Sequence, residues 1–358
     1  MKFPRITLLA TLLLTAPAAA QLQITPPAAT PSPSTEKAKA KPATKPHTIT
    51  KKKEAAPAPK PSASPSTALP ATVIPAPPTD NSNVDLVFGA YQRGQYKTAF
   101  DLASARAKTG DAKAMTMLGE LYSNAMGIRR DYAKAVEWYK RASDAGDREA
   151  MFALAMMRMA GRGSPIDKGD AVKLMASAAK LGEPKAAYNL ALLYLDGQTL
   201  PQDIKRSAEL LRQAADAGLP EAQYALATFY KEGTGVPKDL DKAVRLLQAA
   251  SLADNVDAEV EYAIAMFNGT GTSKNQPAAV ALLRKASRQN SAIAQNRLAW
   301  VLINGMGTPV DKVEGFKWHL VAKTSGKGDP ELDKQLADLP AEDRAKAEAA
   351  AKKWLGTK

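Results

Sequence analysis

The sequence predicts an all-α protein built as a solenoid of helix-turn-helix repeats. A first observation is a strict 36-residue period, in which one position is alanine in six successive copies without insertion or deletion. A second is another uniform alanine column 28 residues further along each copy. A third is that every copy holds two stretches with apolar residues at helical spacing. Units of this kind bury their apolar faces against their neighbours in a stack. The two columns are Ala114, Ala150, Ala186, Ala222, Ala258 and Ala294, and Ala142, Ala178, Ala214, Ala250, Ala286 and Ala322.

The copy at residues 220–255 shows how one repeat is expected to form. Apolar residues recur at helical spacing from Glu221 to Lys231, which predicts a first helix. Gly233 and Gly235 follow, and glycine readily adopts the left-handed conformation that ends a helix. A second helix is predicted from Lys242 to Leu252.

An acidic or amide residue precedes the second helix in every copy and is predicted to be its N-cap. Its side-chain oxygen can accept hydrogen bonds from the exposed amides of the first helical turn. Because asparagine replaces aspartate once, the column is interpreted as structural and not catalytic. Its members are Asp131, Asp167, Asp203, Asp239, Asn275 and Asp311.

Two bulky columns are predicted to form the core around the alanines, which should lie where helix backbones pass closely. The column of the first helices is Leu118, Leu154, Leu190, Leu226, Tyr262 and Leu298. The column of the second helices is Trp138, Leu174, Leu210, Leu246, Leu282 and Trp318.

Residues 222–243 read A-x-Y-x-L-A-x-x-Y-x-x-G-x-G-V-P-x-D-x-x-K-A, a pattern that resembles the Sel-1-like repeat, a relative of the tetratricopeptide repeat. The resemblance covers about two-thirds of the chain. It implies a right-handed α-solenoid that binds proteins or peptides, and it implies no reaction. Some copies depart from the pattern, most clearly where Arg158 replaces the usual tyrosine and where Asp254 and Asn290 replace the glycine between repeats. Ala125 and Thr199 replace loop glycines.

Residues 1–20 are predicted to be a secretory signal peptide, because a basic start precedes a short apolar run and the small residues 18–20. That run is too short for an uncleaved transmembrane anchor to be the better interpretation. The chain has no cysteine, which excludes disulfides, thiolate metal sites and lipid attachment at an N-terminal cysteine. We therefore expect the periplasm of a Gram-negative bacterium, or secretion, as the location.

Residues 21–82 are predicted to be a disordered linker rich in proline, alanine and lysine, since they contain no aromatic residue. Together with the signal peptide they carry over half of the net charge of +13. This charge suits weak contact with anionic envelope components, whereas nucleic acid is not expected without aromatic residues for stacking. The linker would either tether the repeats or only solubilise them.

The repeats should occupy residues 83–327, with a shortened capping hairpin at 83–111 followed by six copies. Residues 328–358 are predicted to form C-terminal capping helices, and a monomer without a membrane span is expected. The two histidines are His47 in the linker and His319 in a packed helical column. Neither forms a catalytic or metal-binding set, so no catalytic residue, metal or cofactor is predicted.

The predicted function is that of a non-enzymatic scaffold or adaptor of the bacterial envelope that binds a protein or peptide, with a regulatory or exopolysaccharide-related role. The alternative is an enzyme that hydrolyses peptidoglycan or β-lactams, because some members of the resembling family are linked to such activity. Those members are rich in cysteine, unlike this chain.

The resemblance places the columns at positions 120 and 123 on the concave face that the first helices line. Four repeats are apolar there, and the polar pair Thr228 and Lys231 divides them into two patches, which suggests a site for a peptide or helix. The other interpretation is that superhelical curvature buries these side chains against adjoining repeats. The predicted partner-binding residues are Met156, Met159, Leu192, Leu195, Ile264, Phe267, Trp300 and Ile303.

Overall fold

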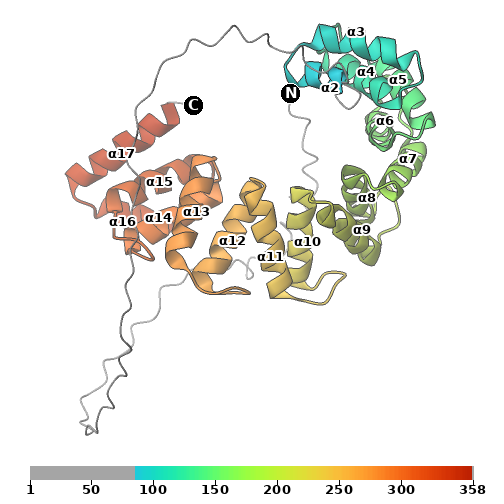
Figure 1. The fold of residues 1–358 in the computed structure, drawn as a ribbon. Coiled ribbons are helices and arrows are strands. Elements are labelled where there is room, and N and C mark those ends of the chain that lie inside the picture. Colours follow the sequence, from blue (N-terminus) through green and yellow to red (C-terminus); the bar gives the residue numbers. More distant parts are fainter. Residues whose placement is uncertain (1–84, 357–358) are drawn as a thin grey trace, which may run out of the picture. The chain divides into compact units, whose positions relative to one another are not determined.

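The described part of the chain, residues 85–356 of a computed structural model, contains 16 helices and confirms the all-α prediction. The predicted signal peptide and linker lie outside these residues. The helices follow one another in pairs along the chain (Figure 1). The capping hairpin consists of α2 (Leu86–Gln92) and α3 (Tyr96–Ala107). The six repeats are formed by α4 (Ala112–Asn124) and α5 (Tyr132–Asp144), α6 (Arg148–Ala160) and α7 (Lys168–Lys180), α8 (Pro184–Asp196) and α9 (Ile204–Asp216), α10 (Pro220–Glu232) and α11 (Leu240–Leu252), α12 (Val256–Asn268) and α13 (Gln276–Arg288), and α14 (Ala292–Asn304) and α15 (Lys312–Thr324). The chain ends with α16 (Pro330–Ala337) and α17 (Ala341–Gly356).

Both alanine columns are buried, as predicted. Ala114 is 2% exposed and the other 11 members are fully buried. From α2 to α14, each helix packs mainly against the helices immediately before and after it in the chain. Such nearest-neighbour packing is typical of a repeat protein, in which each unit completes the core of the next.

The predicted N-caps are confirmed in all six repeats. The side chain of Asp239, for example, accepts a hydrogen bond of 2.9 Å from the amide of Lys242, and Asn275 accepts one of 3.1 Å from the amide of Ala278. The first helices end at a residue in the left-handed conformation, which is Ala125 in the first repeat, with φ of 58°, and glycine in the other five. Alanine can hold this conformation at a modest energetic cost, so the replaced glycine does not change the repeat.

The predicted core column of the second helices is partly wrong. Leu210 and Trp318 are buried, but Trp138, Leu174, Leu246 and Leu282 are partly exposed. The column that is buried in every repeat lies one residue later, because one step along a helix turns a side chain by about 100°. It consists of Tyr139, Met175, Leu211, Leu247, Leu283 and His319.

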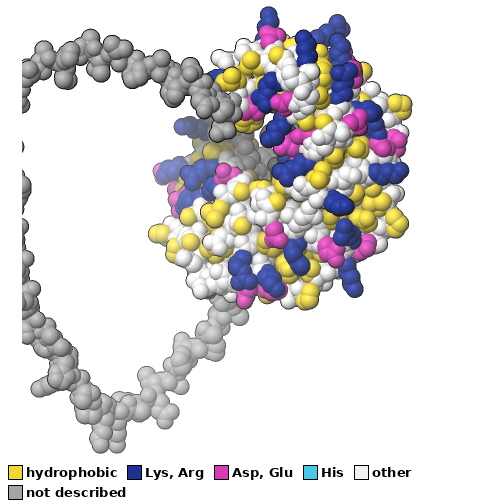
Figure 2. Space-filling view, turned by 45° about the vertical axis from the view of Figure 1, so that its right-hand side comes forward, with side chains coloured by type: hydrophobic (Ala, Val, Ile, Leu, Met, Phe, Trp, Pro, Cys, Tyr) yellow, Lys and Arg dark blue, Asp and Glu magenta, His cyan; other side chains and the backbone are white. Residues whose placement is uncertain are grey.

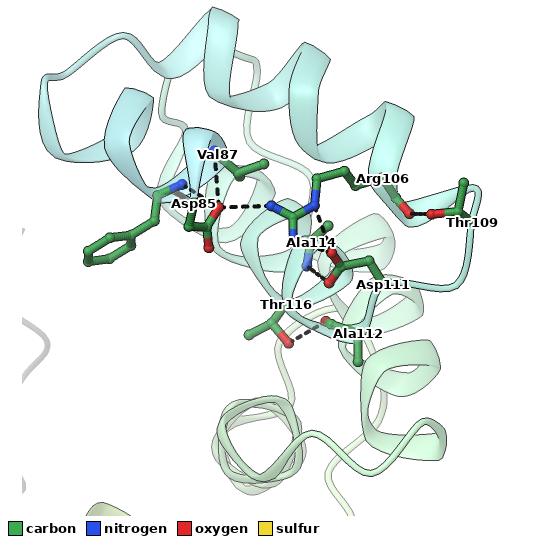
Figure 3. A network of polar contacts seen from close by, with 9 residues as sticks. Asp85, Val87, Arg106, Thr109, Asp111, Ala112, Ala114 and Thr116 are labelled. Atoms are coloured by element: carbon green, nitrogen blue, oxygen red, sulfur yellow. Dashed lines mark hydrogen bonds and ion pairs between the residues drawn. The ribbon is translucent and has the colours of Figure 1, made fainter. Parts of the chain in front are cut away.

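The N-terminal end of the stack is held by one arginine (Figure 3). Arg106 occupies the column that is alanine in the complete repeats, and α2 has 7 residues where the first helix of repeat 1 has 13. The guanidinium Nη1 lies 2.9 Å from Oδ1 of Asp85, the N-cap of α2, and Nε donates a bond of 2.7 Å to Oδ2 of Asp111, the N-cap of α4. Because α2 is short, the long side chain finds room where a complete repeat requires alanine.

The C-terminal end is covered by α17, which packs on α15. The rings of Trp318 and Trp354 meet edge to face with centroids 5.1 Å apart. Lys317 lies over both rings, and its burial lowers the pKa of its ammonium group. Aromatic contacts of this kind close the last apolar face of the stack, as a terminal capping element must.

Candidate functional site

The four predicted residues of repeats 2 and 3 form a partly exposed apolar surface, called here the repeat 2–3 patch. Met156 and Met159 lie on α6, and Leu192 and Leu195 lie on α8, the first helix of the next repeat. All four are partly exposed. Three of them, Met156, Met159 and Leu195, also pack against the same buried cluster. Apolar side chains that stay partly exposed can accept a partner without first being uncovered.

The predicted residues of repeats 5 and 6 are less accessible. Phe267 is 5% exposed and Ile303 is 6% exposed, so these two belong to the core and cannot act as exposed anchors. Ile303 lies against Gly315 of α15, where an added Cβ would come within 2.6 Å of it. Trp300 is partly exposed, and its indole N–H donates a hydrogen bond of 2.8 Å to Oδ2 of Asp329, the N-cap of α16. Ile264 is partly exposed.

Three aromatic residues extend the candidate surface and were missed in the sequence. Phe152, Tyr188 and Tyr224 occupy one column at the repeat period, and all three are partly exposed. Phe152 and Tyr188 precede Met156 and Leu192 by four residues, which places each pair on the same side of its helix. Burial, followed by the nearby carboxylate of Glu221, raises the pKa of Tyr188 to about 12. The aromatic spacing of 36 residues was the signal in the sequence that indicated this column.

The repeats that these helices form match a known family model. The model of the Sel1 repeat matches residues 112–147, 148–183, 184–219, 220–255, 256–291 and 292–326, which is more than half of the chain. The chain belongs to the Sel1-repeat family. No match is found among curated proteins.

Solved structures of bacterial Sel1-repeat proteins are similar to this chain. A Sel1-repeat protein from Oxalobacter formigenes is 24% identical, with a TM-score of 0.60 over 67% of this chain and 98% of that one. A protective antigen of uropathogenic Escherichia coli, c5321, is 22% identical, with a TM-score of 0.49 over 72% of this chain and 64% of its own. A Sel1-repeat protein from Klebsiella pneumoniae is 22% identical, with a TM-score of 0.38 over 56% of this chain and 98% of its own. The first likeness supports the Sel1-type solenoid and leaves the partner open.

Acidic residues flank the repeat 2–3 patch at the ends of the Sel1 first helices. Asp196 ends α8 and Glu232 ends α10, and neither makes an ion pair with another described residue. The C-terminus of a helix itself carries a partial negative charge of about half a unit. At the boundary between repeats 4 and 5 the charges are paired, since Nζ of Lys231 lies 3.1 Å from Oε2 of Glu261. Asp196 directly follows Leu195, so its unpaired negative charge is next to the apolar patch.

A polar depression lies between the turns that join Sel1 repeats 4, 5 and 6. Asp254 and Asn290 line it in place of the glycine found in the other turns, with φ of 58° and 69°. Lys285 Nζ lies 2.7 Å from Oδ1 of Asp254 and 2.5 Å from Oε1 of the buried Glu259. Lys285 neutralises part of the acidic charge of Asp254 and Glu259. We therefore interpret the depression as a feature of the turns between the repeats.

His319 takes part in the packing of the last Sel1 repeat. The imidazole is fully buried, and its Nε2 lies 2.9 Å from Oδ1 of Asp333 in α16. The same carboxylate accepts a bond of 2.8 Å from Lys323, and these contacts lower the pKa of Asp333. The contact between His319 and Asp333 therefore fastens α16 to the stack.

Within residues 85–356, no group of three or more histidine or carboxylate side chains could hold a metal ion, and no helix could cross a bilayer.

Proposed function

We propose that the protein is a non-enzymatic scaffold that docks a segment of a partner protein on the repeat 2–3 patch. The observation that carries this proposal is the contrast between the two predicted patches. Met156, Met159, Leu192 and Leu195 are all accessible, whereas Phe267 and Ile303 are buried. Methionine is flexible and polarisable and adapts to different apolar surfaces, which suits a docking site.

The partner segment that fits is apolar with lysine or arginine beside its anchor residues. The apolar anchors would lie over the methionines and leucines, with Phe152 and Tyr188 at one border. The basic residues would lie near Asp196 and Glu232, whose carboxylates have no ion-pair partner in the described chain. Complementary charge at the rim of an apolar site mainly provides specificity and fast association.

The location of this activity is proposed to be the bacterial envelope. The support comes from residues 1–20, which have the composition of a signal peptide. A protein exported in this way would meet partners in the periplasm or outside the cell. Labelling of fractionated cells with an antibody would place the protein, and a cytoplasmic pool alone would contradict export.

A site-specific crosslinker tests the docking site. A photoreactive amino acid at Met159 should capture a partner from envelope extract, and the same group at Leu252 should not. Leu252 is the matched control because it is an exposed apolar residue at the end of α11 in repeat 4. The variant Leu195→Ser should reduce capture at least tenfold at a temperature where the variant remains folded, since an anchor residue contributes about 2 kcal/mol.

Two results would contradict the proposal. Equal crosslinking from Met159 and Leu252 would mean that the patch has no selectivity. Turnover of peptidoglycan or a β-lactam by the purified protein, abolished by a point substitution without unfolding, would instead establish an enzyme.

A further inference from the structure

The loops inside the first three hairpins carry an excess of positive charge, and they are called here the basic loop edge. They are residues 93–97 of the capping hairpin, 124–132 of repeat 1 and 160–168 of repeat 2. They contain six basic residues, Arg93, Lys97, Arg129, Arg130, Arg162 and Lys168, against two acidic residues, Asp131 and Asp167. The corresponding loops of repeats 3 to 6 contain three lysines against five acidic residues. The basic charge is thus confined to one part of the stack.

The three loops are held against one another by glycine. Gly127 lies so close to the start of α3 that an added Cβ would be 2.9 Å from the backbone nitrogen of Lys97. Gly163 lies closer still to the start of α5, since a Cβ added to Gly163 would be 2.2 Å from the carbonyl oxygen of Tyr132. Each loop therefore packs directly on the preceding hairpin, which brings the three cation-bearing loops side by side.

Most of these cations are free to bind an external anion. Lys97, Arg129, Arg162 and Lys168 make no ion pair with any residue in the described range 85–356. The two aspartates are already used as N-caps, with bonds of 3.0 Å from the amide of Lys134 and 2.9 Å from that of Asp170. Arginine, which supplies four of the six cations, binds phosphate through two parallel hydrogen bonds.

An exposed isoleucine stands among these cations. Ile166 is 64% exposed, and repeats 3 to 5 have Gln202, Lys238 and Lys274 at the same position. Figure 2 brings forward the side on which α4–α7 lie in Figure 1, and Lys and Arg side chains stand there beside hydrophobic ones. A free polyanion would gain little from such an apolar side chain, whereas the headgroup region of a bilayer accepts both kinds of group.

We propose that the basic loop edge binds the surface of a bilayer that contains anionic phospholipids. The arginine and lysine side chains contact the phosphates, and Ile166 enters the headgroup region. The binding is peripheral and reversible, and it leaves the repeat 2–3 patch on the first helices for a protein partner. This inference does not depend on the proposed function.

Sedimentation with lipid vesicles tests the proposal in the full chain. The test variant is Arg129→Gln, Arg162→Gln and Lys168→Gln together, and the matched control is Lys238→Gln, Lys274→Gln and Lys312→Gln. Both remove three charges, and both keep the lysines of residues 21–82. With vesicles of phosphatidylglycerol and phosphatidylcholine in about 0.1 M salt, the test variant should lose on the order of 100-fold in partitioning, about fivefold per charge. The control should lose less than about fivefold, and vesicles of phosphatidylcholine alone should bind neither protein.

The isoleucine separates a bilayer from a soluble polyanion. Ile166→Ser should weaken vesicle binding several-fold and leave the binding of inorganic polyphosphate unchanged. Val310→Ser is the control, because Val310 holds the same position in repeat 6 and is 58% exposed. Equal losses for the two triple variants would overturn the proposal in favour of a net-charge effect. Unchanged vesicle binding by Ile166→Ser, with polyphosphate bound more tightly than vesicles, would overturn it in favour of a polyanion site. Melting temperatures check that all variants fold.

Discussion

Arg158 and Asp170 form an ion pair that joins the two helices of repeat 2. The same two positions are tyrosine and lysine in repeats 1 and 4, where Nζ of Lys134 lies 5.5 Å from the ring centroid of Tyr122 and Nζ of Lys242 lies 5.4 Å from that of Tyr230. In repeats 1 and 4, a lysine of the second helix lies over an aromatic ring of the first helix. In repeat 2, the first helix supplies the cation and the second helix supplies a carboxylate. Both arrangements hold the hairpin closed, so the unusual Arg158 is explained by its partner.

Exchanging this pair as a unit should preserve stability. Arg158→Tyr alone leaves Asp170 without its cation and should lower the free energy of unfolding by about 1 kcal/mol. Asp170→Lys alone brings two cations together and should cost a similar amount. The double variant recreates the pairing of repeat 1 and should recover most of the loss. Urea unfolding of the four proteins measures the coupling, and strictly additive changes would show that the pair does not act as a unit.

The loop glycines should differ in cost according to what lies beside them. Gly163→Ala places a Cβ at a φ of 74° and within 2.2 Å of the carbonyl oxygen of Tyr132, so a loss above about 3 kcal/mol is expected. Gly146→Ala is the matched control, because its φ is 89° but nothing lies within 4 Å, and it should cost only about 1 kcal/mol. Thermal unfolding measures both. Equal costs would mean that backbone conformation alone requires glycine in the loop.

Phe267 and Met156 should behave differently although both were predicted to bind a partner. Phe267→Ala removes a buried ring and should destabilise by about 3 kcal/mol or more. Met156→Ala shortens a half-exposed side chain and should cost less than about 1.5 kcal/mol, since part of its surface already faces solvent. The free energy of unfolding of each variant checks this. A small loss for Phe267→Ala would return that residue to the candidate surface.

The Arg106 contact should stabilise the protein in a pH-dependent manner. Burial raises the pKa of Asp111, but hydrogen bonds from the Ala114 amide and the Arg106 guanidinium lower it on balance. A carboxyl group whose folded pKa is depressed adds stability above its unfolded pKa, about 3.9, and this stability is lost as the pH falls through the lower folded value. Arg106→Gln should therefore cost about 0.5–1 kcal/mol at pH 6, and the difference from the parent protein should shrink below about pH 4.

A matched arginine separates this effect from a general loss of positive charge. Arg93 donates to the amide oxygen of Gln95 at 3.3 Å, and that partner does not titrate. The effect of Arg93→Gln on the melting temperature should accordingly not shrink as the pH falls from 6 to about 3. A pH-independent loss for Arg106→Gln would mean that its contribution is packing of the side chain and not its bond to Asp111.

The repeat architecture and its caps were predictable from the sequence because they depend on local chemistry. A fixed period, uniform alanines and an N-cap aspartate constrain the backbone within a few residues, and these predictions are confirmed from Asp131 to Asp311. The left-handed turns at Asp254 and Asn290 likewise follow from residue type.

Only the tertiary structure decided which apolar residues are accessible. Met159 and Phe267 belong to the same predicted column, but Met159 is partly exposed and Phe267 is buried. The same packing buries Met175 and leaves Leu174, one residue earlier, partly exposed. Accessibility depends on how closely the neighbouring helices approach, and this distance depends on the residues of the facing helix, such as Gly315 of α15, whose lack of a side chain leaves room for Ile303 of α14. The local sequence therefore determines where each helix forms, and the packing of the facing helices determines which side chains remain free to bind.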